Sequence, residues 1–266
     1  MHTSSKSLIE NLFEYSRTLG WKQDLVWLAG VLFGWGMLAG AVLVPPYPEN
    51  PGGVVFAYAS VLMRSALYVG CSLFGGGGCR IFGRLWAMGL VAGFLEILVE
   101  YPLAAGWFAG RLVYLGGMEW RILETPLYMP FAWACVIVDG CYLAARAFGW
   151  SGRKMHFSQA SMIASIASGL FAFGSVGLYE LFGYRAGWWM YEEATLMFAG
   201  NLVVFIPVAE FLMFAAGALA ASALALGRTL NPVVGILLAG AVFGVAIGAG
   251  SGLAYLLFEV LPRALV

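Results

Sequence analysis

The sequence predicts an all-α, polytopic membrane protein with about seven transmembrane helices, forming a single domain over residues 1–266. Hydrophobic residues make up 62% of the chain and charged residues only 11%, and the mean hydropathy is +0.86. Soluble domains carry about 25% charged residues, so this chain is too apolar to be one. Its apolar runs are long enough to cross a bilayer as helices, and they lack the alternation of a membrane β-barrel.

Seven apolar runs follow one another, separated by segments rich in Gly, Pro or charge. We expect helices at about residues 24–44, 54–75, 84–105, 122–146, 159–182, 196–226 and 233–261. The more polar start of the chain has no signal-peptide pattern. Leu8, Ile9, Leu12 and Phe13 recur there at helical spacing, so residues 1–23 are predicted to hold a helix on the cytoplasmic membrane surface.

Lysine and arginine are distributed unevenly between the two ends of the predicted bundle. One end holds Lys6, Arg17, Lys22, Arg80, Arg84, Arg146, Arg153, Lys154 and Arg228, and the other holds Arg111, Arg121, Arg185 and Arg263. Because positively charged loops stay in the cytoplasm, we expect a multi-pass cell-membrane protein with a cytoplasmic N-terminus and its C-terminus on the opposite side. Arg64 falls inside the second span, where an arginine either snorkels or pairs with an acid.

Composition also disfavours several kinds of site and partner. The formal net charge is zero and no basic stripe is present, which argues against a nucleic-acid partner. Cys71, Cys79, Cys135 and Cys141 lack the spacing of zinc or haem ligands, and we interpret them as structural thiols. Both histidines lie outside the predicted spans, so we expect no metal site.

The middle of the chain resembles itself after a shift of about 81 residues. The aligned pairs are Ala105-Gly106-Trp107 with Ala186-Gly187-Trp188, Pro126 with Pro207 and, one residue out of register, Glu100 with Glu180. Both copies would cross the membrane in the same direction. We therefore interpret residues 84–146 and 159–226 as a parallel internal repeat.

Glycines recur every four residues in the last predicted helix, at Gly240, Gly244, Gly248 and Gly252. Small residues along one face let helices approach closely in lipid. We expect this face to pack within the molecule, and a homo-oligomer contact is the alternative.

An acid in the sixth span, Glu210, is the strongest functional signal. It follows Pro207 in an apolar, membrane-length segment, where an acidic residue costs about 2.5–3.5 kcal/mol on insertion scales. Glu210 should therefore face a protein interior or a wet cavity. We interpret it as a proton donor or a base that stabilises a cation.

Four further acids are predicted to gather towards the outer side of the bundle. Glu96 and Glu100 lie four residues apart on one helical face, where two carboxylates disfavour each other's ionisation and one can act as an acid. Glu124 and Glu180 are placed near the ends of their spans as further catalytic acids. Asp139 lies nearer the cytoplasmic end and is expected to make a structural contact.

Aromatic residues crowd the same outer zone. Either they form an interfacial belt, or they line a pocket in which aromatic faces stabilise a cation. The residues predicted to line such a pocket are Tyr101, Trp107, Trp133, Trp188, Trp189 and Tyr191.

Two segments resemble a known family. Gly187-Trp188-Trp189-Met190-Tyr191 and Pro207-Val208-Ala209-Glu210-Phe211-Leu212-Met213-Phe214 are similar to motifs of the small integral-membrane lycopene cyclases. The spacing of Glu180, Gly183, Gly187 and Tyr191 also resembles that of the related carotenoid hydratases. The likeness covers residues 179–220 well and residues 96–146 poorly. Ala209 stands where the cyclases usually have a first glutamate, so of that acid pair only Glu210 carries over.

Acids, aromatics and this resemblance together imply an integral-membrane isoprenoid cyclase that protonates a polyene or epoxide and closes a ring through a carbocation. More broadly, its architecture and acids resemble those of seven-helix membrane-bound terpene cyclases. Such chemistry needs no cofactor, and its partners would be a lipid-soluble isoprenoid and membrane lipids. A carotenoid hydratase is one alternative, and a non-enzymatic transporter or assembly partner is the other.

Overall fold

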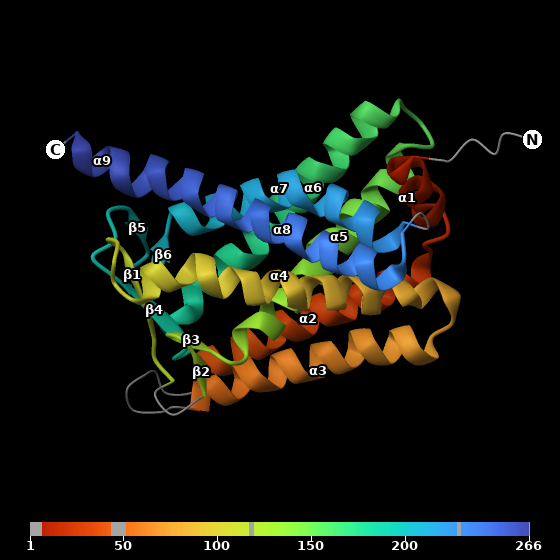
Figure 1. The fold of residues 1–266 in the computed structure, drawn as a ribbon. Helices are drawn as coiled ribbons and strands as arrows, with labels where there is room; N and C mark the ends of the chain where they lie inside the picture. The colour runs from red at the N-terminus through yellow and green to blue at the C-terminus, as the bar shows by residue number, and fades with distance from the viewer. Residues whose placement is uncertain (1–6, 44–51, 117–119, 228–229, 266) are drawn as a thin grey trace, which may run out of the picture.

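The protein is an all-α, multi-pass membrane bundle (Figure 1). The computed structural model describes residues 7–43, 52–116, 120–227 and 230–265. Seven helices of the described chain are long and apolar enough to cross a membrane, as predicted. They are α2 (Trp21–Leu43), α3 (Gly52–Phe74), α4 (Arg80–Ala104), α5 (Met129–Ser151), α6 (Phe157–Gly183), α7 (Phe205–Leu226) and α8 (Pro232–Tyr255).

Shorter elements complete the described chain. The helical ones are α1 (Leu8–Ser16), the 3-10 turn η1 (Gly77–Cys79), the π-helical turn η2 (Leu256–Val260) and α9 (Leu261–Ala264). The strands are β1 (Arg111–Tyr114), β2 (Arg121–Ile122), β3 (Thr125–Pro126), β4 (Trp189–Glu192), β5 (Met197–Phe198) and β6 (Leu202–Val203). They pair antiparallel as β1–β4, β2–β3 and β5–β6. The strands gather at one end of the bundle, the strand end, and α1 lies at the other, the α1 end (Figure 1).

The predicted fourth and sixth spans begin too early. Residues 122–128 and 196–204 were assigned to helices, but they hold β2–β3 and β5–β6 instead. The backbone turns inside each hairpin through left-handed residues, Leu123 (φ 57°) in the first and Ala199 (φ 51°) with Gly200 (φ 82°) in the second. A helix cannot continue through such residues, whatever their hydropathy.

The order of elements repeats along the middle of the chain. Helix α4 is followed by β1, the β2–β3 hairpin and α5, and helix α6 is followed by β4, the β5–β6 hairpin and α7. Both α4 and α6 run towards the strand end (Figure 1). This shared order is what a parallel duplication would produce.

The ends of α4 and α6 are capped in the same way. Gly106 and Gly187 both adopt positive φ, 74° and 69°. The following amides of Trp107 and Trp188 donate to the carbonyls five residues back, those of Pro102 and Gly183. A glycine in this position ends a helix without steric cost, and the shift of 81 residues aligns the two caps. The predicted match of Pro126 with Pro207 does not hold, because the former lies in β3 and the latter in the first turn of α7.

Helix α1 closes one end of the bundle. Ser7 and Glu10 form a reciprocal capping box, which satisfies backbone amides at the start of the helix. Leu12 is fully buried, and the ring of Phe13 meets Phe148 and Phe157 edge-on at centroid distances of 5.8 and 5.0 Å. The apolar face predicted for residues 1–23 therefore packs on the bundle. Residues 1–6 of that prediction lie outside the described part.

The glycines of α8 pack within the molecule, as expected. A Cβ at Gly240 would lie 2.5 Å from that of Val91, and one at Gly244 would lie 2.7 Å from a methyl group of Leu95. Both contacts are with α4, so the glycine face brings α8 against α4. A Cβ at Gly252 would have no heavy atom within 4 Å.

Candidate functional site

A cavity of about 180 Å³ lies in the strand-end half of the bundle. Its walls come from α3 to α7 and from the β1–β4 ribbon, with one residue from α8. Most of the lining is apolar. Eight of the residues predicted from sequence line this cavity: Glu96, Glu100, Glu180, Glu210, Trp133, Trp188, Trp189 and Tyr191.

Helical spacing places the four acids together. Glu96 and Glu100 lie one turn apart near the end of α4, and Glu180 lies in the last turn of α6. Glu210 lies one turn beyond Pro207 near the start of α7. Because α4 and α6 end where α7 begins, all four side chains reach the same level of the bundle.

Glu100 and Glu180 each have hydrogen-bond donors. Glu100 Oε1 accepts from the hydroxyls of Tyr114 and Thr125 at 2.8 and 2.7 Å. Glu180 Oε2 accepts from Trp189 Nε1 at 3.1 Å. Donated hydrogen bonds stabilise a carboxylate, so these two groups are equipped to hold negative charge.

Glu96 and Glu210 have a different environment. Both are buried, with 5% and 3% of their surface exposed. In each, Oε2 is buried and has no hydrogen-bond partner among the described residues. Buried polar atoms without partners are rare in native structures and call for an explanation. An apolar setting without donors stabilises the neutral carboxylic acid of Glu210 relative to the anion, whereas Glu96 also interacts with the side chains of Glu100 and Trp133.

The β1–β4 ribbon presents one face to the cavity. Leu112 and Tyr114 of β1, with Trp189 and Tyr191 of β4, are buried and line it. Arg111, on the opposite face, is paired with Glu192 at 3.6 Å in an exposed ion pair. Side chains alternate along a strand, so the register fixes which four residues face inward.

The inward tyrosines keep their protons. Burial raises the pKa of Tyr114 well above its ordinary value, and the neighbouring Glu100 adds to the shift. Burial likewise raises the pKa of Tyr191, with Glu180 as the next contribution. Both hydroxyls are therefore hydrogen-bond donors at neutral pH, and Tyr114 donates to Glu100.

Two consecutive tryptophans, Trp188 and Trp189, form an aromatic wall. The rings of Trp188 and Trp189 lie 5.7 Å apart, and Tyr114 meets Trp189 edge-on at 6.4 Å. Trp188 Nε1 donates to the carbonyl oxygen of Gly53 at 2.6 Å, which joins this wall to the start of α3. A Cβ at Gly53 would lie 1.7 Å from the carbonyl oxygen of Ala186, so this approach requires glycine.

Three of the predicted site residues lie elsewhere. Glu124 is exposed in the connection between β2 and β3, because this stretch is a hairpin and not the top of a helix. Trp107 is 65% exposed. Its ring meets the half-buried Tyr101 edge-on at 5.2 Å, outside the cavity. These two aromatics lie at the strand end of the bundle, where an interfacial belt is the ordinary role.

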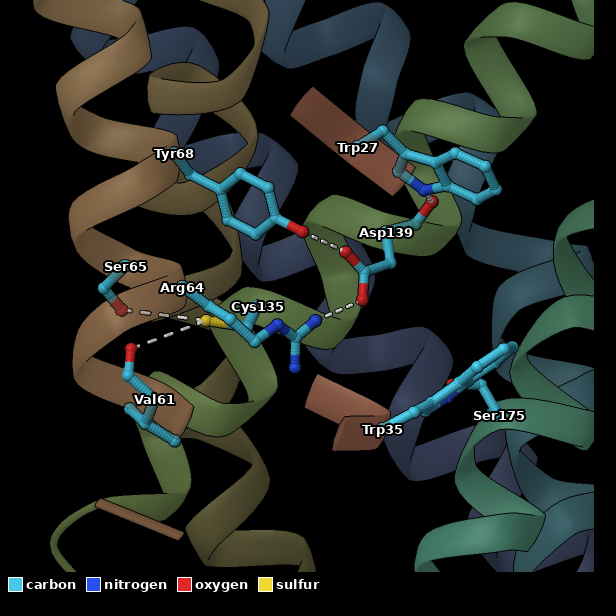
Figure 2. A network of polar contacts seen from close by, with 9 residues as sticks. All are labelled: Trp27, Trp35, Val61, Arg64, Ser65, Tyr68, Cys135, Asp139 and Ser175. Atoms are coloured by element: carbon cyan, nitrogen blue, oxygen red, sulfur yellow. Dashed lines mark hydrogen bonds and ion pairs between the residues drawn. The ribbon is translucent and has the colours of Figure 1, made fainter. Parts of the chain in front are cut away.

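Deeper in the bundle, a buried ion pair adjoins the cavity. Arg64 of α3 donates to Asp139 Oδ2 of α5, and Tyr68 donates to Asp139 Oδ1 at 2.5 Å. Figure 2 shows both α3 side chains converging on this carboxylate. This pairing is the acid-paired alternative predicted for Arg64, and it gives Asp139 the structural contact that was expected of it.

Glycines in α2 make room for this network. A Cβ at Gly30 would lie 2.0 Å from the hydroxyl oxygen of Tyr68, and one at Gly34 would lie 3.1 Å from Arg64 Nη1. Gly30 and Gly34 are four residues apart in the sequence, and small residues at this spacing allow a neighbouring helix to approach closely.

Several residues of the site were not predicted. Tyr114 and Thr125 come from short strands whose sequence shows no long apolar period. Outside the cavity, another buried acid was not predicted either: Glu259, in the π-helical turn η2, is 1% exposed and accepts the Thr195 amide through both oxygens at 3.0 and 2.9 Å. An acid within the last predicted span was the available signal for Glu259.

One family model matches the chain. It is described as a domain of unknown function (DUF6989) and matches residues 84–258. The chain belongs to this family. The matched region runs from α4 to η2 and holds all four cavity glutamates. No curated protein and no solved structure matches the chain. Within the described ranges, no group of three or more His, Cys, Asp or Glu could hold a metal ion.

Proposed function

We propose that the protein is a membrane enzyme that protonates the end group of a lipid-dissolved isoprenoid and closes a ring through a carbocation. The observation that carries the proposal is the meeting of four glutamates, from α4, α6 and α7, in one largely apolar cavity. Ionisable groups inside a membrane bundle are costly and mark functional sites. The resemblance of residues 179–220 to small membrane lycopene cyclases supports the same chemistry.

The proton donors in this proposal are Glu210 and Glu96, and the acceptors are Glu100 and Glu180. The first two carry an unpartnered, buried Oε2, which favours the neutral acid. The other two accept hydrogen bonds from Tyr114, Thr125 and Trp189, which favours the carboxylate. Acid and base of a proton-transfer reaction would thus lie in one cavity.

The reaction balances without a redox cofactor. The proton of Glu210 moves to the CH carbon of a terminal (CH3)2C=CH group, forming a C–H bond and leaving a tertiary carbocation on the dimethyl carbon. The electrons of a second alkene then form the C–C bond that closes the ring. A proton lost from the neighbouring carbon to Glu180 restores a double bond, so product and substrate have the same composition.

Aromatic side chains would stabilise the cation. Trp133, Trp188 and Trp189 line the cavity beside the acids. A cation over an aromatic face gains about 0.5–2 kcal/mol, most where water is excluded. With about 180 Å³ of space and about 15 Å³ needed per water molecule on this measure, the cavity would take an end group and not a whole long polyene.

The orientation in the membrane is also part of the proposal. Arg17, Lys22, Arg80, Arg84, Arg146, Arg153 and Lys154 lie at or near the α1 end, whereas Arg111, Arg121, Arg185 and Arg263 lie at the strand end. Lys6 and Arg228, assigned to the α1 end from sequence, lie outside the described residues. The positive-inside rule then puts the α1 end in the cytoplasm and the cavity towards the opposite face.

The test compares Glu210→Gln with the wild type in membranes supplied with a linear carotenoid and with shorter polyprenyl alkenes and epoxides. Glutamine has nearly the same shape as glutamic acid but cannot deliver its proton, so products of unchanged mass should fall about 10²- to 10⁴-fold. Glu124→Gln is the matched control, since Glu124 is exposed and outside the cavity, and it should leave product formation within twofold.

Other outcomes would assign a different activity or none. Products heavier by one water would identify hydration of the cation. Proton-coupled uptake into vesicles without product would identify a carrier. Unchanged product formation in Glu210→Gln would show that Glu210 is not the acid.

A further inference from the structure

The cavity has a second polar region that the proposed reaction does not use. Arg64 and Ser60 of α3 and Tyr179 of α6 line the cavity in addition to the four glutamates. Arg64 and Tyr179 both lie beside Gly34, since a Cβ there would be 3.1 Å from Arg64 Nη1 and 2.6 Å from the Tyr179 hydroxyl.

Arg64 has an unused hydrogen-bond donor. Only 4% of its surface is exposed. Its Nη2 donates to Asp139, as Figure 2 shows, but its Nε is buried and has no hydrogen-bond partner among the described residues. A guanidinium carries five N–H donors, and leaving a buried one unsatisfied is costly. A lining residue with a free, buried N–H therefore points to an acceptor supplied from the cavity.

Arg64 lies deeper than the acids. It is twelve residues from the start of α3, whereas Glu210 is five residues from the start of α7. At 1.5 Å per residue, the difference of seven residues puts Arg64 about 10 Å deeper along the helix axis than Glu210. By the same count it lies about 6 Å deeper than Glu96, which is eight residues from the strand end of α4. A ligand that meets the acids with one group would meet Arg64 with a second, remote group.

We propose that Arg64 binds a neutral oxygen acceptor of the ligand, such as a carbonyl, hydroxyl or ether oxygen, through its Nε–H. The proposal rests on the proposed function only for the isoprenoid nature of the ligand chain. The substrate class is thereby narrowed from isoprenoids in general to those in which an oxygen lies about 10 Å from the end protonated by Glu210.

Charge decides for a neutral acceptor. Asp139 already balances the positive charge of Arg64 in the same buried ion pair. A carboxylate or phosphate on the ligand would add an unbalanced negative charge in a cavity that holds four glutamates, at a high desolvation cost. A neutral oxygen satisfies the free N–H without that cost.

The experiment measures binding of three probes of equal chain length to the full-length protein in lipid nanodiscs. The probes are farnesene, farnesol and farnesal, and the readout is quenching of intrinsic tryptophan fluorescence, since three tryptophans line the cavity. The quantity compared is the ratio of oxygenated-probe to hydrocarbon affinity in each variant, because partitioning of the probes into lipid cancels between variants.

We expect this affinity ratio, for farnesol or farnesal over farnesene, to be about tenfold or more higher in the wild type than in the double variant Arg64→Met/Asp139→Asn, which carries neither charge. The double variant removes both charges and keeps an acceptor for Tyr68. Arg64→Lys, which keeps the ion pair but removes Nε–H, should lose most of the preference as well.

Equal affinity ratios in the wild type and in both variants would overturn the proposal and assign the Nε–H to water. Glu210→Gln should retain the preference even where turnover is lost, since Arg64 is unchanged. Failure of this inference and failure of the proposed reaction are thus separated by different variants and different readouts.

Discussion

Removing one partner of the Arg64–Asp139 ion pair should destabilise the protein far more than removing both. Only 4% of Arg64 and 3% of Asp139 is exposed, so neither charge can be hydrated when its partner is lost. Breaking a buried ion pair from one side costs about 3–5 kcal/mol. We expect Arg64→Met and Asp139→Asn each to lower the free energy of unfolding by about this amount.

The double variant should recover most of this loss. Arg64→Met/Asp139→Asn removes both buried charges, and the Asn oxygen can still accept the Tyr68 hydroxyl that now donates to Asp139. The remaining cost comes from the unpaired amide of Asn, about 1–3 kcal/mol. The two single effects should therefore be strongly non-additive.

The assay is reversible unfolding in mixed detergent micelles, followed by tryptophan fluorescence. Arg146→Met is the control, because the Arg146–Asp24 pair at 2.8 Å is about one-third exposed and should cost only about 1 kcal/mol. Additive single effects, or single effects no larger than that of the control, would refute the view that Arg64 and Asp139 neutralise each other.

Two further pairs of variants test packing and the cavity wall. Gly240→Ala should lower the free energy of unfolding by about 1–3 kcal/mol, because its Cβ would overlap α4. Gly252→Ala should be neutral or stabilising, because a Cβ at Gly252 meets open space. Equal effects of the two substitutions would contradict the packing of α8 against α4. Trp133→Ala should slow product formation about threefold to thirtyfold through lost cation stabilisation. Trp107→Ala, outside the cavity, should change the rate of product formation less than twofold. A larger effect of Trp107→Ala than of Trp133→Ala would show that the reaction does not take place in this cavity.

The seven spans could be predicted because bilayer thickness fixes the length of an apolar helix. The same criterion misplaced the starts of two spans. Residues 196–204 are apolar, yet they form the β5–β6 hairpin. Hydropathy reports how apolar a segment is and not which backbone angles it adopts. An apolar hairpin directly before a helix is therefore predicted as part of the same transmembrane helix.

The four acids of the cavity could be predicted from the cost of a carboxyl in a membrane helix. Glu124 was placed wrongly because the β2–β3 hairpin that holds it was predicted to be the start of a helix. The donors to Glu100 could not be predicted in this way. Tyr114 reaches it because β1 pairs with β4, and the paired residues are separated by up to 81 positions. Local sequence periodicity carries no information about so distant a pairing.

The partner of a buried charge, as in the Arg64–Asp139 ion pair, could not be predicted from local sequence either. Each member predicts that a partner exists, because an isolated charge within a membrane bundle is costly. Arg64 and Asp139 are 75 residues apart, and several other acids were available. Only the packing of α3 against α5 selects the partner, and Gly30 and Gly34 of α2 leave room for the Tyr68 and Arg64 side chains.

The repeated helix–strand–hairpin–helix unit places Trp133 and Glu210 in matching positions. Each lies three residues after a proline in the first turns of α5 and α7, and both line the cavity. Two identical halves would give a site with twofold symmetry, which could hold a ligand equally well in either direction. An indole in one half and a carboxyl in the other remove that ambiguity. The cavity is therefore asymmetric, and a molecule bound in it would meet the carboxyl of Glu210 and the indole of Trp133 with different parts of its surface.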